Sequence, residues 1–333
     1  MPYVYRHFIP QNTAPAAAKS IGVYDSNGKK VTEIPLGRMT PKTEEPLYSF
    51  GLVSDMHLWK AGLAWSPDTK FDAALSFFES EGCAFCAHCG DITQTGLYFE
   101  TDAETLNPVQ FEEYKRWCDA HPNLPVYGIC GNHESYVNPI TNNLMELKAY
   151  TGTDLYYTVE QDNDLFIFIG QPSGSIVMGN DAFSWLSETL AANTGKRCFV
   201  FVHAYIEEDS GDPLDVRENS IFDYWGAVKT TAFMNLLKQY ENVILFHGHS
   251  HMKFEYQEYD VNANYTERNG FKSVHVPSLG VPRDINFDTM KSQDDQSASQ
   301  GYIVDVYGDC VVLTGMDFIK NEPIPLGVYK IDT

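Results

Sequence analysis

The chain has 333 residues, 43% of them hydrophobic and 14% aromatic, which is enough to bury the core of one large domain or two ordinary ones. It carries 45 Asp and Glu residues against 23 Lys and Arg, and this net charge of −22 argues against nucleic acids and anionic membrane surfaces as partners. Seven scattered cysteines, without a signal-like apolar segment or a run of ~20 apolar residues, favour a reduced, cytoplasmic location and no membrane span.

The first part of the chain differs from the rest, and we expect residues 1–46 to form an arm that precedes the main domain. Residues 14–18 resemble a linker, and residues 21–31 are typical of a small hairpin with its turn at Asn27-Gly28. We expect a single domain over residues 47–333. A partner protein could bind to this arm, but no other feature of the sequence indicates such a partner.

From Tyr48 onward the chain alternates between strand and helix patterns. Apolar runs predict three strands, over residues 48–54, 83–89 and 126–130. Helices are expected to begin at the pairs Ser66-Pro67, Asn107-Pro108 and Asn138-Pro139, because proline suits the first turn of a helix.

The second half repeats this alternation with more hairpins. Further strands are expected over residues 156–159, 165–169, 197–202 and 243–246, helices over 182–192 and 227–240, and a closing hairpin over 302–307 and 310–314. The polar segment 291–300 is expected to be a flexible loop. This order of elements predicts a layered α/β sandwich whose loops gather at the carboxyl ends of the strands.

Residues that commonly bind metals follow five of the predicted strands. They are Asp55 and His57, Asp91, Asn132 and His133, His203, and His249 and His251. Each position alone has a simpler explanation, since a single histidine or a Gly-Asp pair is more often structural than functional. Five such endings in one chain are hard to explain by accident, so we interpret them together as one site.

The chemistry of these side chains favours two metal ions. Carboxylates and imidazoles with one neutral amide suit divalent ions such as Mn, Fe, Zn or Co. Two cations ~3.5–4 Å apart need a ligand that bridges them, and water held between them can attack phosphorus as hydroxide. Such cations would also reverse the local charge of an acidic protein and allow an anionic substrate to bind.

The motifs resemble, in their order, those of the calcineurin-like metallophosphoesterase superfamily. They are Asp55-Met56-His57, Gly90-Asp91, Gly131-Asn132-His133-Glu134, His203 and Gly248-His249-Ser250-His251. The resemblance implies a four-layer α-β-β-α sandwich of two mixed sheets, with a dinuclear metal site at the carboxyl ends of the strands.

The resemblance also implies a role for each matching residue. The metal ligands would be Asp55, His57 and His251 for one ion, Asn132, His203 and His249 for the other, and Asp91 as the bridge. His133 would contact the phosphoryl group or protonate the leaving oxygen, and the ions would be Mn, Fe or Zn.

Departures from known branches narrow this interpretation. Gln94 occupies the position at which purple acid phosphatases have a tyrosine ligand, and Gly90-Asp91 is not followed by the Asp-Arg-Gly of protein Ser/Thr phosphatases. The segment Gly90-Asp91-Ile92-Thr93 is more similar to the class III cyclic-nucleotide phosphodiesterase branch. Some relatives have an aspartate at the position of Gln94 that supports the catalytic histidine, so the strength of His133 as an acid stays open.

Other residues are weaker candidates. The residues that could contact the substrate are Arg283, His275 and Tyr136, and those that could hold the metal ligands in place are Glu134 and Gln94. The simpler alternatives are a surface salt bridge for Arg283 and a structural place in the core for the others. Cys83, Cys86 and Cys89 are spaced as in iron–sulfur proteins, but they lie in a predicted strand and are better explained as buried small residues.

We therefore expect a metal-dependent hydrolase of small phosphate esters, with phosphodiesters favoured over phosphoproteins. A phosphomonoesterase of the same fold, or a non-catalytic scaffold that binds a larger assembly, remain the alternatives. A nuclease is disfavoured by the net charge of −22.

Overall fold

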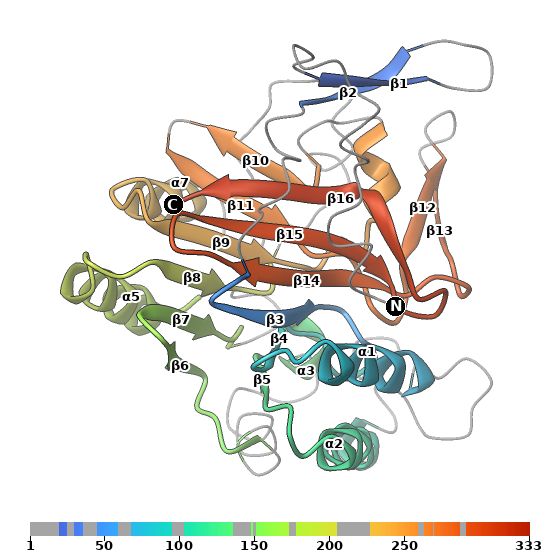
Figure 1. Cartoon of the computed structure of the whole chain (residues 1–333). Coiled ribbons are helices and arrows are strands. Elements are labelled where there is room, and N and C mark those ends of the chain that lie inside the picture. Colours follow the sequence, from blue (N-terminus) through green and yellow to red (C-terminus); the bar gives the residue numbers. More distant parts are fainter. Residues whose placement is uncertain are drawn as a thin grey trace.

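The computed structural model describes residues 20–24, 30–35, 45–58, 68–94, 103–135, 148, 151–172, 178–204, 227–258, 263–268, 270–286 and 291–333. Two six-stranded sheets face each other, and helices cover their outer faces (Figure 1). The four-layer α-β-β-α sandwich of two mixed sheets is therefore confirmed. Among the described residues, no helix is long and apolar enough to cross a membrane.

The first sheet has the strand order β16-β15-β14-β3-β4-β5. Its strands are β3 (Tyr48–Val53), β4 (Cys86–His88), β5 (Val126–Gly128), β14 (Gln300–Val306), β15 (Cys310–Asp317) and β16 (Glu322–Asp332). The first three are mutually parallel, and the last three run antiparallel to their neighbours. Helices α1 (Asp68–Ser80) and α2 (Ala103–Ala120) lie over it, and α1 buries an apolar face that includes Phe71 and Leu75.

The second sheet has the strand order β10-β11-β9-β8-β7-β6. Its strands are β6 (Tyr156–Gln161), β7 (Asp164–Ile169), β8 (Cys198–Phe201), β9 (Val243–His247), β10 (Tyr265–Arg268) and β11 (Phe271–His275). The four central strands are parallel, and β6 and β10 are antiparallel edges. Residues of α5 (Asn180–Ala192) and α7 (Ala227–Leu237), such as Leu186 and Phe233, pack against its outer face.

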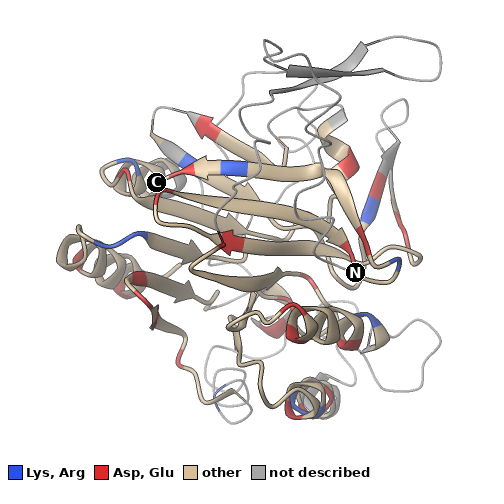
Figure 2. Cartoon of the chain, in the orientation of Figure 1, with Lys and Arg blue, Asp and Glu red and all other residues tan. Residues whose placement is uncertain are grey.

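The space between the sheets is filled mainly by aromatic side chains. Phe50 of β3 packs edge-on against Phe166 of β7, and Phe168, Phe201 and Phe246 stack across the second sheet. Charged residues lie mostly on the helices, turns and strand ends, while the inner strands are nearly free of them (Figure 2). The acidic surface therefore surrounds an apolar sandwich, as the composition predicts.

The two sheets are joined at the ends of their parallel strands. Ser54, directly after β3, forms a parallel bridge with Ser278, and the amide of Leu279 donates to the Ser54 carbonyl at 2.8 Å. Parallel strands in both sheets therefore deliver their carboxyl ends to one place.

Smaller elements complete the described structure, and two of them correct our expectations. β1 (Ser20–Tyr24) pairs antiparallel with β2 (Lys30–Pro35), as predicted for a hairpin in the arm, while the expected turn at Asn27-Gly28 lies outside the described residues. The expectation of a flexible loop over residues 291–300 is wrong for residues 291–294, because β13 (Lys291–Asp294) pairs with β12 (Arg283–Asn286). α2 begins at Ala103 rather than at Asn107, which agrees with the helix preference of the Ala103-Glu104 pair and of an acidic first turn. The helix expected from Asn138 lies largely outside the described residues.

Candidate metal centre

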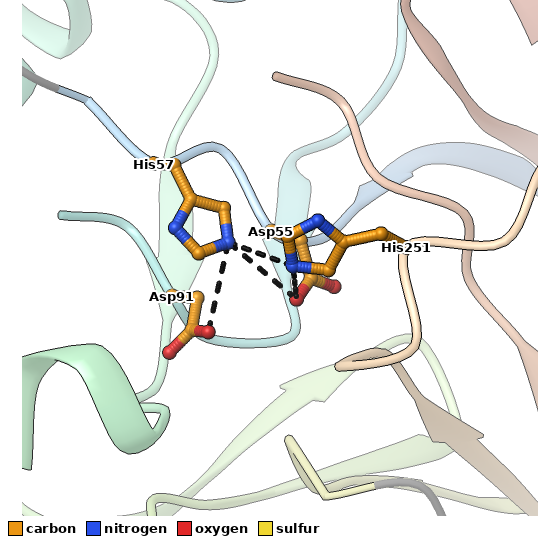
Figure 3. A group of neighbouring side chains, drawn as sticks. All are labelled: Asp55, His57, Asp91 and His251. Atoms are coloured by element: carbon orange, nitrogen blue, oxygen red, sulfur yellow. Dashed lines mark hydrogen bonds and ion pairs between the residues drawn. The ribbon is translucent and has the colours of Figure 1, made fainter. Parts of the chain in front are cut away.

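Side chains from both sheets converge where the parallel strands end (Figure 3). Asp55 and His57 follow β3, Asp91 follows β4, and His251 follows β9. All four are buried, and one possible ligand atom of each lies within 4.8 Å of the others. The strand endings that the sequence analysis grouped together therefore form one cluster.

The first group is centred on His57 and His251. Their Nε2 atoms lie 2.9 Å apart, and His251 Nε2 is 3.2 Å from Asp55 Oδ1. Asp91 Oδ2 approaches from the other side, 3.7 Å from His57 Nε2. Two imidazoles and two carboxylates thus direct their ligand atoms into one small volume.

A second group shares Asp91 with the first. His203 Nε2 lies 3.2 Å from Asp91 Oδ2 and 2.8 Å from Asn132 Oδ1. His249 Nδ1 is 3.2 Å from the same His203 nitrogen. The carboxylate of Asp91 therefore stands between the two groups, in the position that a bridging ligand would need.

The hydrogen bonds behind the imidazoles fit metal binding. His203 Nδ1 donates to the Cys89 carbonyl at 2.8 Å, and His251 Nδ1 donates to the Val281 carbonyl at 3.1 Å. Each bond leaves the lone pair of Nε2 directed into the cluster, as is usual for histidine ligands. Bonds of ~2.1 Å to one metal would place ligand atoms ~3.0–3.4 Å apart; the separation of 3.2 Å falls in this range, and the separation of 2.9 Å lies just below it.

Electrostatics also favour cations at this place. Burial by itself would raise the pKa of Asp91, but the charges of His203 and its neighbours hold that pKa well below its usual range. Burial opposes the protonation of His203, yet Asp91 raises the pKa of this imidazole above its ordinary value. Asp91 thus favours positive charge beside it, and a divalent cation would supply that charge in place of a proton.

The backbone of the ligands is unusual. Asp55, His57, Asp91, His249 and His251 have φ between 51° and 73°, in the left-handed region that few residues other than glycine adopt. Among the described non-glycine residues, the others with positive φ are Asp162 and Asn321, which lie in turns. Strained backbone gathers at functional sites, so this distribution supports the cluster as the functional centre.

Glu134 contacts the backbone of two segments that carry candidate ligands. It is fully buried, and its carboxylate accepts hydrogen bonds from the amides of Gly131 at 2.6 Å, Thr93 at 2.7 Å and Asp91 at 3.2 Å. Burial and the charge of Asp91 raise the pKa of Glu134. This side chain ties the loop after β4 to the short helix α3 (Asn132–Ser135).

His133 lies beside the two groups without joining either of them. Its amide donates to Asp91 Oδ1 at 2.8 Å, while its Nε2 is 4.0 Å from Asp91 Oδ2. Its Nδ1 lies 3.0 Å from the backbone carbonyl of Gln94, so this carbonyl and not the Gln94 side chain holds the ring. Sequence reasoning missed this contact because a backbone carbonyl leaves no residue signature.

The candidate substrate contacts fall in different places. His275 is buried, with its Nε2 2.6 Å from Ser250 Oγ. Arg283 is partly exposed and donates from Nε to Asp294 at 3.1 Å. Tyr136 lies outside the described residues. Cys83, Cys86 and Cys89 are buried free cysteines, as expected for small residues of the core.

Two buried ligand groups that share a carboxylate, at the ends of two facing sheets, are the arrangement that a two-metal site requires. A family model described as calcineurin-like phosphoesterase matches residues 48–253, which is more than half of the chain. The chain therefore belongs to the calcineurin-like phosphoesterase family, a family of metal-dependent phosphoesterases. The resemblance seen in the sequence motifs is confirmed.

Solved structures show the same fold at low sequence identity. A dimetal phosphatase from Danio rerio has a TM-score of 0.60 and 15% identity, over 86% of this chain and 99% of that one. The GAP50 anchor of the inner membrane complex of Plasmodium has a TM-score of 0.52 and 14% identity, over 86% and 88%. A search of curated proteins finds no significant match.

Proposed function

We propose that this metal-dependent phosphoesterase hydrolyses small phosphodiesters, with His133 as the general acid. The observation that carries the proposal is the shared position of Asp91 between two buried ligand groups, with the partly exposed His133 beside it. The Gly90-Asp91-Ile92-Thr93 segment supports diesters rather than phosphoproteins as substrates. The net charge of −22 disfavours long polyanions for the same site.

The residues divide the work of the reaction. Asp55, His57 and His251 would hold one cation, while Asn132, His203 and His249 would hold the other with Asp91 shared. When bound, the cations polarise the phosphoryl group and make water a stronger nucleophile. His133, as an imidazolium, donates its Nε2 proton to the leaving oxygen as the bond between that oxygen and phosphorus breaks, while its Nδ1–H stays bonded to the Gln94 carbonyl. The nitrogen and oxygen ligands suit Mn, Fe or Zn.

Metal analysis combined with ester hydrolysis tests this function. We expect the purified protein to bind two divalent ions and to hydrolyse bis(p-nitrophenyl) phosphate faster than p-nitrophenyl phosphate. His249→Ala should lose metal and at least ~100-fold in turnover, because it removes a ligand from the second group. A matched His121→Ala variant, which alters contacts with Glu79 and Asp72, should keep both properties.

Two results would count against the proposal. Preference for the monoester would make the protein a phosphomonoesterase of the same fold. Two bound metals without hydrolysis of any ester would favour the scaffold alternative; GAP50, a protein of the same fold, is named as an anchor in the inner membrane complex of Plasmodium. The complete ligand set argues against a scaffold. A scaffold that binds through its arm should also lose its partner when residues 1–46 are deleted, whereas an enzyme should keep its turnover.

Arg283 is the substrate contact that we propose from the described residues. Its amide donates to the His251 carbonyl at 2.8 Å, so β12 begins beside a ligand of the first group. Asp294 accepts from Nε, which leaves both Nη groups without a partner among the described residues. After burial, the charge of Arg283 is the next cause that lowers the pKa of His251. We therefore place this guanidinium near the bound phosphate ester.

Replacing Arg283 with glutamine should raise KM roughly tenfold and leave the metal content unchanged, because a charge-assisted hydrogen bond to the substrate is lost. Steady-state kinetics and metal analysis of the same preparation measure both. Arg116→Gln, on the exposed face of α2, is the matched control. An unchanged KM would mean that Arg283 only forms the surface ion pair with Asp294.

A further inference from the structure

The last motif contains a tight turn that is rare in proteins. The amide of Ser250 donates to the Gly248 carbonyl at 3.0 Å, and His249 between them has a φ of 73°. This combination is typical of the classic γ-turn, which is rarer and more strained than the inverse γ-turn. The turn has a clear effect, because His249 Nδ1 joins the second ligand group while His251, two residues later, joins the first.

The side chain of Ser250 fastens this turn to the neighbouring strand. Its hydroxyl lies 2.6 Å from Nε2 of His275, at the end of β11, and accepts a hydrogen bond from the Met252 amide at 3.2 Å. The residue between the two ligands therefore has one bond to the chain that follows and one to a separate strand. A strained turn persists only when its surroundings hold it in this way.

His275 is well placed to hold the turn because both sheets fix its backbone. Its amide donates to the Asn264 carbonyl at 2.9 Å, and its carbonyl accepts from the hydroxyl of Tyr302, on β14 of the first sheet, at 3.3 Å. β11 runs parallel to β9, which carries the turn. The side chain is 2% exposed, so little room exists for a substrate to reach it.

We propose that His275 is a positioning residue of the metal centre and not a substrate contact. Through the hydroxyl of Ser250 it holds the γ-turn that directs His249 and His251 to separate ligand groups. The inference rests on the metal centre of the proposed function, but it does not depend on which ester is hydrolysed. Loss of this bond should therefore weaken metal binding itself.

The test uses Ser250→Ala and His275→Phe in the full chain. Titration calorimetry with Mn²⁺ should show a 10- to 100-fold weaker affinity in both, the usual effect of losing a residue that orients metal ligands. Ser250→Thr keeps the hydroxyl and should restore binding. Ser80→Ala removes a hydroxyl bonded only to the exposed end of α1 and is the control.

A double variant separates positioning from general stability. Because both residues act through one bond, the combined variant should bind Mn²⁺ no more weakly than the worse single variant. The inference would be overturned if Ser250→Ala bound Mn²⁺ within threefold of the wild-type affinity and lowered only the melting temperature of the metal-free protein. It would also be overturned if the losses of Mn²⁺ affinity in the two single variants added up in the double variant. If His275→Phe does not fold, the comparison of Ser250→Ala with Ser250→Thr decides alone. Normal metal binding in wild type without hydrolysis would contradict the proposed function and leave this inference standing.

Discussion

Replacing Gly131 with alanine is expected to abolish metal binding and to reduce hydrolysis by more than ~100-fold. A Cβ atom at this position would lie 2.2 Å from Asp91 Oδ1 and 2.5 Å from the Asp91 amide nitrogen. The Cδ2 atom of His203 would be 2.8 Å away. These atoms belong to the shared ligand and to backbone, so they cannot move aside without dismantling both ligand groups. Metal content after gel filtration and turnover of the diester measure the effect.

The chain offers a matched control for this substitution. A Cβ added to Gly308 would meet nothing within 4 Å, and Gly308→Ala should keep metal and turnover at the wild-type level. If Gly131→Ala retained two metals, the loop after β4 would be more adaptable than its contacts indicate. The close approach of Gly131 to Asp91 would then not be required for metal binding.

Replacing His133 with asparagine should lower kcat by roughly 10²- to 10⁴-fold while both metals stay bound. The large loss is expected for diesters of alkyl alcohols, whose leaving oxygen needs a proton, and a much smaller one for nitrophenyl esters, which leave readily as anions. Metal should persist because His133 Nε2 is 4.0 Å from the nearest oxygen of Asp91 and belongs to neither ligand group. Kinetics over a series of leaving groups, with metal analysis of each sample, provides the measurement.

The pattern of losses distinguishes the roles of His133. Equal losses for all leaving groups would show that it binds the phosphoryl group instead of protonating the alcohol. Loss of metal would show that the ring orders Asp91, whose Oδ2 lies 4.0 Å from Nε2 of His133. Gln94→Ala should change little, since the backbone carbonyl of residue 94 makes the contact with the ring.

The fold, and the gathering of the candidate ligands in one place, could be predicted from the sequence because both depend on residue types at strand ends. Asp55 and Asp91 follow apolar runs that could hardly be anything but buried strands, and parallel strands bring such endings together. The position of α2 and the pairing of β12 with β13 could not be predicted in the same way. Polar segments such as residues 291–294 become strands only when a partner strand is present.

The finer parts of the site depend on contacts that side-chain identity does not encode. The Gln94 carbonyl that holds His133 is one of them, and the bond between Ser250 and His275 is another. His275 was expected near the substrate, yet its side chain is buried and contacts Ser250 between two candidate ligands. Sequence position indicated the right neighbourhood for this residue, and packing decided which side of the loop it faces.

The left-handed backbone of five candidate ligands also constrains how this site can change over generations. Glycine, asparagine and aspartate tolerate that conformation, whereas valine, isoleucine and threonine do not. A descendant that abandons catalysis should therefore first accept glycine or asparagine at positions 55, 57, 91, 249 and 251. β-Branched residues should follow only after the loops themselves have been rebuilt. In descendants that have lost activity, the loop geometry and not metal binding would then limit which residues occupy these five positions.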